Sequence, residues 1–328
     1  MSDRTLPRAN FISVVVPTHN RATRLPQCLT ALLGLTLPDG VGCEVICVDN
    51  NSSDDTRLVV ERHMATASPI QLRYVLEPRR GASQARNAGL LAAQGTIITM
   101  TDDDCVVDSG WLLSIWHEFN AAPEVGLLGG RVELYDANDL PITIRTSRER
   151  TAPTPELAFN TIPSCNIAIR RAVIDAIGDF DTDFGPGTAV HAGEDTDFVH
   201  RAAIAGFGIL YSPDVLVYHA HGRRTPADRR NLERGYFKGR GAVYCKHILS
   251  MDRVVLRAAY WEIHKLLRDT ALSLARRQSP REELWVLRLL CAGAFLHIAT
   301  RLRRLVSAPF TRRNLQSSAY IPRKSASN

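Results

Sequence analysis

The chain contains the stretch Thr96-Ile97-Ile98-Thr99-Met100-Thr101-Asp102-Asp103-Asp104-Cys105, a β-branched apolar run that ends in three carboxylates. The run predicts a buried strand. Side chains alternate along a strand, so Asp102 and Asp104 are expected on one side and Asp103 on the other. Carboxylates on one side repel each other unless a cation lies between them, and oxygen ligands favour Mg²⁺ or Mn²⁺. Alternatively, Asp104 or Asp108 caps the helix that follows.

The composition is that of a globular protein. The chain has 328 residues, of which 45% are hydrophobic and 23% charged, enough for one large or two modest domains with an ample core. No apolar segment follows the first charged residues, so we expect no secretory signal and a cytoplasmic protein. Seven cysteines without a paired spacing typical of zinc sites are expected to be reduced.

The charge is divided unevenly along the chain. Residues 1–222 contain 17 Lys and Arg against 27 Asp and Glu, a net charge of −10, whereas residues 223–328 contain 23 against 7, a net charge of +16. This predicts a boundary near residue 222 and an anionic partner for the second part, either a membrane surface or nucleic acid. A solvated, arginine-rich helical face is the alternative.

Upstream of the acidic triplet, strand and helix patterns alternate. The run over 11–16 is continuously apolar and is stopped by Pro17, a pattern typical of a strand buried in a parallel sheet. The alternation predicts an α/β fold with a mostly parallel sheet and helices on both faces. The elements expected are strands over 11–16, 44–48, 71–76 and 96–100 and helices over 25–33, 56–64 and 82–93.

Polar residues follow three of these strands. Thr18, Asp49 and Asp102 each lie just past a strand end, and ligands of such sheets bind outside the carboxyl ends of the strands. The first turn lacks the glycine pattern of dinucleotide-binding folds, and no phosphate-binding loop of the P-loop type occurs. Hydride transfer with a nicotinamide cofactor is therefore disfavoured, and P-loop ATP hydrolysis is excluded.

Eight short blocks occur in an order that resembles a known family. They are 14–21 (VVVPTHNR), 48–54 (VDNNSSD), 81–89 (ending ARNAG), 102–104 (DDD), 165–171 (CNIAIRR), 177–181 (IGDFD), 193–198 (GEDTDF) and 213–219 (PDVLVYH). Together they resemble the glycosyltransferase family 2 enzymes, which have the nucleotide-sugar-binding fold called GT-A. The resemblance covers residues 11–222, about the first two thirds of the chain.

The resemblance implies a donor site for a nucleotide sugar. It places a divalent metal, Mn²⁺ or Mg²⁺, on Asp102 and Asp104 at the family's DXD position, with His219 as a further ligand and His221 as its competitor. Asp49 is expected to accept a hydrogen bond from the nucleobase, although it can also cap a helix. The residues expected to bind the nucleotide sugar are Pro17, Thr18, Asn20, Asp49, Asn51, Arg86, Asp102 and Asp103.

A second acidic cluster precedes an apolar helical repeat. One acid of Glu194-Asp195 is a natural helix cap, but the cluster has more acids than a cap needs. By resemblance, Asp195 is the general base, Glu194 orients it or binds acceptor, and Asp197 is the reserve candidate. The reaction implied is a single displacement with inversion at the anomeric carbon, comparable to inverting glycosidases.

The acceptor side is the least defined part of the sequence. Asn166 and Trp111 are expected near the acceptor, and the irregular segment 135–159 is expected to form an acceptor loop. After residue 222 the pattern predicts helices over 253–277 and 282–305. The second is apolar but short and contains Arg288 and His297, which favours a membrane-interfacial helix, a packed hairpin or a dimer contact over a membrane span.

The domains expected are an N-terminal arm over 1–10, a GT-A catalytic domain over 11–222, a basic helical extension over 223–310 and a disordered tail over 311–328. The function expected is metal-dependent, inverting transfer of a sugar from a UDP- or dTDP-sugar to a hydroxyl of a glycan or lipid-linked acceptor, in the cytoplasm or at the inner face of the cell membrane. Nucleic acid is not expected as a partner. A nucleotidyltransferase and a catalytically silent nucleotide-sugar-binding or scaffolding protein are the alternatives.

Overall fold

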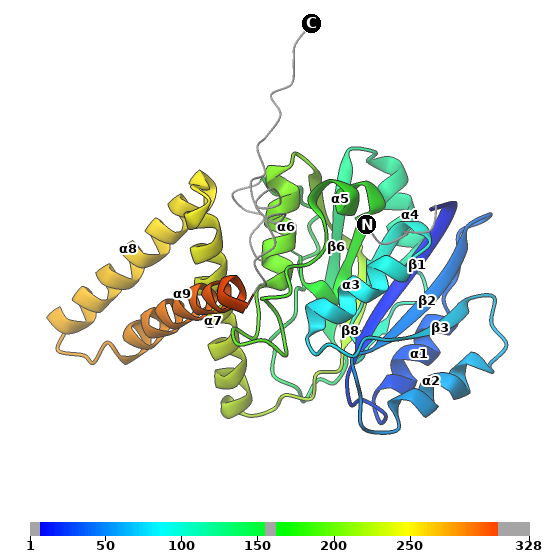
Figure 1. Cartoon of the computed structure of the whole chain (residues 1–328), viewed down its shortest axis with the longest axis horizontal. Coiled ribbons are helices and arrows are strands. Elements are labelled where there is room, and N and C mark those ends of the chain that lie inside the picture. Colours follow the sequence, from blue (N-terminus) through cyan, green and yellow to red (C-terminus); the bar gives the residue numbers. More distant parts are fainter. Residues whose placement is uncertain (1–6, 155–161, 308–328) are drawn as a thin grey trace, which may run out of the picture.

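The computed structural model describes residues 7–154 and 162–307. Their core is one eight-stranded sheet with the strand order β3-β2-β1-β4-β7-β6-β8-β5 (Figure 1). Its first half consists of β1 (Arg8–Thr18), α1 (Leu25–Leu33), β2 (Gly42–Asp49), α2 (Thr56–Met64), β3 (Gln71–Leu76), α3 (Ala82–Ala92) and β4 (Gly95–Met100). These four strands pair in parallel, which confirms the α/β units expected from the sequence.

The second half of the sheet is mixed. It consists of β5 (Cys105–Val107), α4 (Trp111–Ala121), β6 (Val125–Leu134), the short 3₁₀ helix η1 (Ser164–Asn166), β7 (Ile167–Arg170), α5 (Arg171–Ile177), α6 (Glu194–Ile204) and β8 (Gly208–His219). Strand β7 is antiparallel to β4 and β6, and β5 is antiparallel to β8. The sheet is therefore parallel in its first half and mixed in its second.

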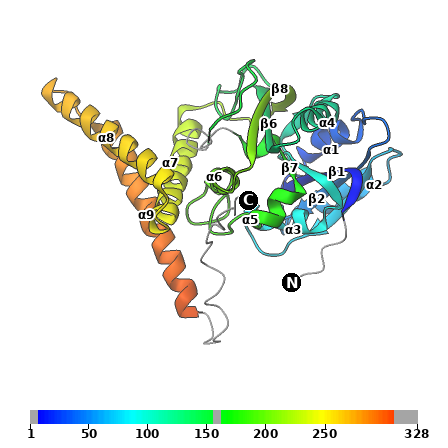
Figure 2. The same cartoon turned by 90° about the horizontal axis from the view of Figure 1, so that it is seen from above.

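Apolar side chains form a core on each face of the sheet. Helices α1, α2 and α4 cover one face, where Trp111 and Phe119 are fully buried. Helices α3, α5 and α6 cover the other, where Phe198 stacks on Phe180 with ring centroids 4.3 Å apart. Figure 2 shows the two layers of helices on either side of the sheet. Burial on both faces explains why β1 and β2 are continuously apolar.

Two boundaries differ from those expected. Strand β1 begins at Arg8, so the end of the predicted N-terminal arm belongs to the sheet. The strand also continues through Pro17 to Thr18. The pairing of β1 with β4 ends at Val15↔Met100, so the missing N–H of proline lies where no ladder bond to β4 is made. The predicted tail over 311–328 and residues 155–159 of the predicted acceptor loop lie outside the described residues.

Three long helices follow the sheet: α7 (Pro226–Leu249), α8 (Arg253–Ala275) and α9 (Arg281–Ser307). Helix α7 begins at a capping box of Thr225 and Asp228, and α9 packs along it. The hairpin of α8 and α9 projects away from the sheet (Figures 1 and 2). The two helices predicted after residue 222 correspond to α8 and α9. The sequence analysis did not predict α7 as a separate helix.

Candidate active site

The three carboxylates of the triplet have three different partners. Strand β4 ends at Met100 and the chain turns, so strand alternation does not orient the triplet. Asp102 Oδ1 lies 3.3 Å from Arg86 Nη2, Asp103 Oδ1 lies 3.4 Å from Arg21 Nε, and Asp104 Oδ1 lies 3.2 Å from His219 Nε2. The prediction that Asp102 and Asp104 lie on one side of a strand is therefore wrong, because both residues lie in a turn after β4. None of the three caps α4, where Asp108 accepts a bond from the Gly110 N–H instead.

Burial sets the proton affinities in this turn. Burial raises the pKa of Asp103 to about 7. For Asp104, burial acts in the same direction, but the hydrogen bond and charge of His219, together with the charges of Arg21 and Arg223, outweigh it and lower the pKa below its usual value. Burial lowers the pKa of His219, but the hydrogen bond with Asp104 and the negative groups around the ring together raise it to about 9. Asp104 and His219 therefore form a charged pair at neutral pH.

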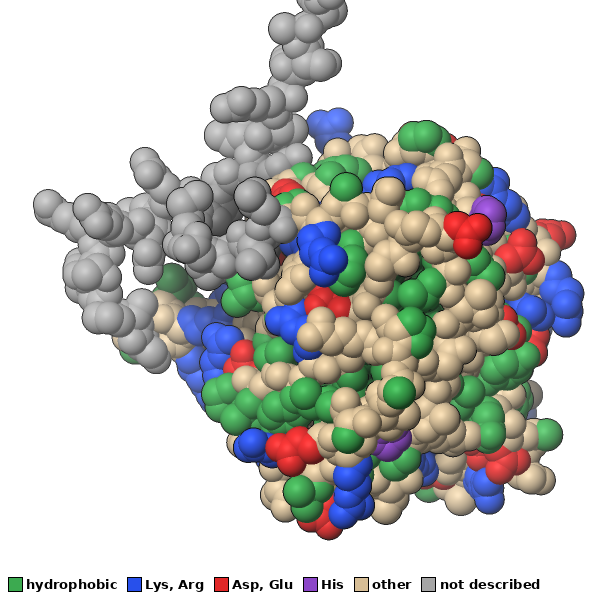
Figure 3. Space-filling model, turned by 90° about the vertical axis from the view of Figure 1, so that its right-hand side faces the viewer, with side chains coloured by type: hydrophobic (Ala, Val, Ile, Leu, Met, Phe, Trp, Pro, Cys, Tyr) green, Lys and Arg blue, Asp and Glu red, His purple; other side chains and the backbone are tan. Residues whose placement is uncertain are grey.

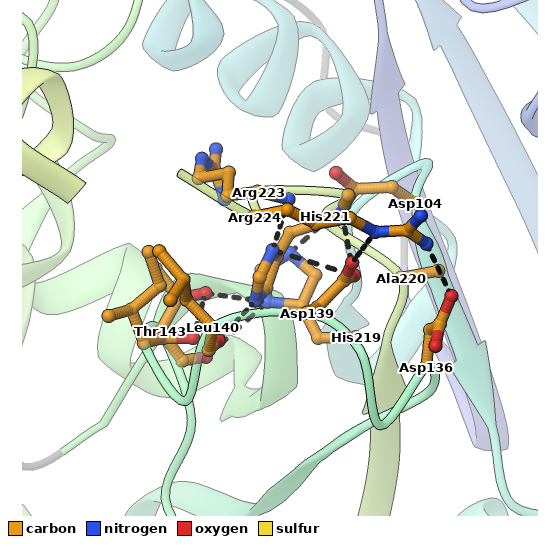
Figure 4. Close-up of polar contacts among 12 residues, drawn as sticks. Asp104, Asp136, Asp139, Leu140, Thr143, His219, Ala220, His221, Arg223 and Arg224 are labelled. Atoms are coloured by element: carbon orange, nitrogen blue, oxygen red, sulfur yellow. Dashed lines mark hydrogen bonds and ion pairs between the residues drawn. The ribbon is translucent and has the colours of Figure 1, made fainter. Parts of the chain in front are cut away.

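Contacts between the segment after β6 and the end of β8 hold His219 in place (Figure 4). His219 Nδ1 lies 3.2 Å from Thr143 Oγ1, on the segment that follows β6. Asp139 accepts bonds from the Gly222 N–H at 2.8 Å and from Arg224 Nε at 2.9 Å. Both ring nitrogens of His221 are engaged with the backbone, one with Leu140 O and one with the Arg223 N–H. Of the two histidines considered, His219 is the one placed beside Asp104.

The nucleotide-side residues meet at the ends of β1 and β2. Asp49 is buried, and its carboxylate accepts bonds from the Ser52 N–H and the Tyr74 hydroxyl, each at 2.8 Å. Thr18 is buried beside it, paired in register with Asp49. Asp49 thus holds a turn that precedes α2 and does not cap that helix, whose N-cap is Asp55, and a nucleobase N–H would be an additional partner.

Asparagine side chains shape the same rim. Asn20 has a positive φ of 53°, and its Oδ1 accepts a bond of 2.7 Å from the Ser53 N–H. Asn51 has a φ of 61° and is exposed, as the left-handed turn after β2 requires. Pro17 is half-buried at the end of β1. The loops after β1 and β2 are therefore hydrogen-bonded to each other, and Asn20 and Asn51 in them are exposed to solvent.

Arg86 connects the two halves of the site. Its Nη1 donates to Glu194 Oε1 at 2.8 Å, and its Nη2 donates to Asp102 and to Ser164 Oγ. Both Arg86 and Glu194 are buried. Burial raises the pKa of Glu194 to about 7, and the charge of Arg86 opposes that rise. Arg86 therefore ties the triplet on one side to the first turn of α6 on the other.

The three acids of α6 differ in their surroundings. Asp197 is fully buried and paired with Arg201 Nε at 2.9 Å, Lys246 Nζ at 2.6 Å and His247 Nε2 at 2.9 Å. Burial opposes ionisation, but Lys246 and these partners hold the pKa of Asp197 well below its usual range. Asp195 is half-exposed and has no ion-pair partner within 7–154 and 162–307. Asp197 is therefore a structural anion, and the reserve assignment as base is withdrawn.

Trp111 and Asn166 do not line an open acceptor site. Trp111 is 0% and Asn166 1% exposed, and the indole Nε1–H donates to Asn166 Oδ1 at 2.9 Å. The amide of Asn166 donates to the backbone carbonyls of Arg131 and Val215, each at 2.9 Å. These bonds fasten β6 and β8 to η1 under the site. The expectation that these residues bind acceptor is corrected to a structural role.

Several site residues were not expected from the sequence. Tyr74 reaches Asp49 because β3 pairs with β2 in parallel register, Arg21 reaches Asp103 from the loop after β1, and Lys246 reaches Asp197 from α7. Only the register of the sheet could have indicated Tyr74. The other two depend on loop and helix placement.

The chemistry of the donor set fits a divalent cation. The Asp102 side chain is 32% exposed, and together with Asp104 it offers carboxylate oxygens, while His219 would offer an imidazole nitrogen once a cation displaces its Nε2 proton; Mn²⁺ and Mg²⁺ accept such ligands. In the described residues the ligand atoms of these three side chains are not gathered within 4.8 Å of one another, so they would hold an ion only after moving together. His219 is oriented by Thr143, as metal-binding histidines are by their other nitrogen.

Comparisons with known proteins identify the family. The model of the family described as Glycosyl transferase family 2 matches residues 13–178. The curated glycosyltransferase AglE of Haloferax volcanii is 26% identical over 258 residues, which span 78% of this chain and 79% of that protein.

Solved structures show the same fold. A mannosyltransferase from Pyrobaculum calidifontis in complex with GDP-Man and Mn²⁺ superposes with a TM-score of 0.61 at 21% identity, covering 92% of this chain and 88% of its own. TarS of S. aureus in complex with UDP-GlcNAc gives 0.55 at 19% identity, covering 71% and 65%. The GT-A-like fold expected from the sequence is confirmed.

Proposed function

Since the chain belongs to glycosyltransferase family 2, we propose that it is a metal-dependent, inverting glycosyltransferase that uses a UDP- or dTDP-sugar. The acceptor is a hydroxyl of a glycan or a lipid-linked precursor at the inner face of the cell membrane. The observation that carries the proposal is the junction at Arg86, which joins the acidic triplet to the turn that presents Asp195. The neighbour solved with GDP-Man and Mn²⁺ and the neighbour solved with UDP-GlcNAc support it by fold.

The proposed binding site for the nucleoside of the donor lies at the ends of β1 and β2. Asp49, Thr18 and Asn20 lie where a nucleoside would contact the ends of β1 and β2, and Asn51 and Pro17 border this position. Asp103, the middle residue of the triplet, contacts Arg21 in the loop that follows β1 and so joins the triplet to that loop. Asp102, Asp104 and His219 would hold Mn²⁺ or Mg²⁺, which stabilises charge on the departing diphosphate.

Catalysis is assigned to the open acid of α6. Asp195 takes the proton of the acceptor hydroxyl while its oxygen forms a bond to the anomeric carbon and the bond to the diphosphate breaks. Glu194, held by Arg86, fixes the first turn of α6 and thereby the position of Asp195. Attack opposite to the leaving group inverts the anomeric carbon, and no covalent nucleophile is needed.

The experiment is a thermal-shift screen of UDP-, dTDP-, GDP-, ADP- and CMP-sugars with and without Mn²⁺, because a ligand that binds the folded state raises the melting temperature. We expect stabilisation by a UDP- or dTDP-sugar that requires metal and is lost in Asp104→Asn but retained in Asp214→Asn, an exposed carboxylate on β8. No shift with any nucleotide sugar would contradict the proposal and favour a scaffolding protein that binds no donor. A product with retained anomeric configuration by NMR would reject inversion.

A further inference from the structure

Helix α8 presents an apolar stripe that no part of the described chain covers. Five large side chains recur at intervals of three, four or seven residues and are exposed: Leu256 36%, Tyr260 59%, Ile263 41%, Leu267 55% and Leu274 60%. Residues at such intervals lie on one face of a helix. A neighbouring face of the helix, with Val255 and Ala259, is buried. The outward face of α8 is therefore apolar along its whole length.

Helix α9 presents a second set of exposed apolar side chains, most of them in its C-terminal half. They are Leu284 45%, Phe295 70%, Ile298 42%, Leu302 56%, Leu305 74% and Val306 87%. Among the described helices, only the segment from Arg281 to Val306 is long and apolar enough to cross a membrane, with a mean hydropathy of 1.4. The other face of α9 is packed: Leu290 lies against Gly241 and Gly293 against the backbone of Lys238. Packing of one face onto α7 favours a helix lying on a surface over a helix crossing it.

The charge of the hairpin selects among the surfaces that could cover these stripes. Residues 253–307 contain 11 Lys and Arg against 4 Asp and Glu. All four acids are engaged: Glu262 with Arg240, Asp269 with Arg268, Glu282 with Arg230 and Glu283 with Ser273. A second copy would therefore bring cation against cation beside the apolar stripes. An anionic surface is complementary to both the charge and the apolar face.

We propose that the α8–α9 hairpin docks on an anionic phospholipid bilayer, with the two stripes inserted at the headgroup boundary. Tyr260 and the neighbouring Trp261, both 59% exposed, are amphipathic rings suited to that depth. Arg257 and Arg268 lie three turns apart on the flank of the α8 stripe, where they meet anionic headgroups. At the end of the molecule away from α8, apolar, acidic and basic side chains are interspersed (Figure 3).

The same hairpin is fastened to the wall of the active site. His297 on α9 stacks on Phe184 with ring centroids 5.5 Å apart, and Arg304 pairs with Asp183. Gly239 of α7 lies directly against Ala192, next to the first turn of α6. Docking of the hairpin therefore fixes the orientation of the site relative to the bilayer. That this orientation serves a lipid-linked acceptor rests on the proposed function.

The test is flotation of the full chain with vesicles of phosphatidylcholine alone and of phosphatidylcholine with an equal share of phosphatidylglycerol. We expect binding to the anionic vesicles only, weakened by salt. The double variant Leu256→Glu/Leu267→Glu should lose at least about tenfold in vesicle binding, because charges enter the apolar face. The matched control, Leu58→Glu/Met64→Glu, changes two exposed apolar residues of α2 and should bind like the unchanged protein.

Light scattering and the donor thermal shift separate the outcomes. Equal binding to both vesicle types, or undiminished binding by the α8 variant, would overturn the proposal. A dimer that dissociates in the α8 variant, without vesicle binding by either protein, would show that a second copy covers the stripes. Vesicle binding without stabilisation by any nucleotide sugar would leave the docking surface standing and reject the proposed function. An unchanged melting temperature of the α8 variant shows that it folds.

Discussion

The nucleotide side and the acceptor side of the site are built in different ways. On the nucleotide side, Asp49 is held by Ser52 and Tyr74, partners 3 and 25 residues away. On the acceptor side, Glu194 is held by Arg86 across 108 residues and Asp197 by His247 across 50. The nucleotide rim thus forms within neighbouring βα units, whereas the turn that presents Asp195 requires α3, α6 and α7 to assemble first.

Within the first turn of α6, the acid proposed as base and the acids that stabilise the structure are different residues. Glu194 and Asp197 are buried with cations, and Asp195 between them is half-exposed. Removal of a paired buried acid leaves an uncompensated cation, whereas removal of the open acid leaves the packing intact. The comparison therefore predicts opposite effects of neighbouring substitutions on activity and on stability.

The largest effect is expected for Asp195→Asn. The amide retains the shape of the side chain but cannot take a proton, so we expect sugar transfer to fall by about 10³-fold or more, within the range of lost general-base catalysis. The melting temperature and the thermal shift produced by the nucleotide sugar should stay near those of the unchanged protein. Initial rates at saturating donor, together with the thermal shift, measure both quantities.

Asp195→Asn also tests the division of the site. Loss of donor binding in proportion to activity would place Asp195 on the nucleotide side and remove its assignment as base. Ser164 offers a control, because its hydroxyl accepts a hydrogen bond from Arg86. The variant Ser164→Ala removes that bond without changing the proposed base. Its loss of activity should be far smaller.

Asp197→Asn should act mainly on stability. The substitution leaves Lys246 and His247 facing a neutral amide in a buried position, for which about 3–5 kcal/mol of destabilisation is typical. Urea denaturation monitored by fluorescence gives the change in the free energy of unfolding. Lys246 keeps its second partner, Asp181 at 2.8 Å, so the loss should lie toward the lower end of that range. A single variant as stable as the unchanged protein would contradict the structural assignment.

A smaller effect is expected for Asn166→Ala, below the floor of the site. The change leaves the indole N–H of Trp111 and the carbonyls of Arg131 and Val215 without their partner, at a cost of about 1–3 kcal/mol for buried polar groups. Since Asn166 is 1% exposed, the KM for acceptor should not change specifically. An increase in that KM without loss of stability would restore the original assignment to the acceptor site.

The same comparison explains what the sequence could predict. Periodicity and turn composition are local signals, and they located β1 to β4, the triplet and the polar residues that follow β1 and β2. The partners of Asp197 and the burial of Trp111 depend on how distant helices pack, which no local pattern contains. Resemblance supplied Asp195, but it could not show which acid of α6 is open. The orientation of the triplet was missed because a strand was extended through a turn.

The last prediction concerns the contact between α9 and the acceptor side. Burial, followed by the charge of Arg301, lowers the pKa of His297 to about 4, against about 6.5 in an unfolded chain. Lys246 also lowers the pKa of His297, while Asp181 and Asp197 raise it. Between these two values the unfolded chain binds more protons than the folded one, so the stability due to neutral His297 is complete above about pH 6.5 and is lost as the pH falls toward 4.

The variant His297→Gln cannot titrate, and from pH 7 to pH 5 it should lose less stability than the unchanged protein, by an amount of order 1 kcal/mol. Urea denaturation of both proteins at the two pH values gives this difference, in which the remaining histidines and carboxylates cancel. Equal pH dependence in the two proteins would mean that His297 is not enclosed against Phe184, and that α9 does not fasten the wall of the active site.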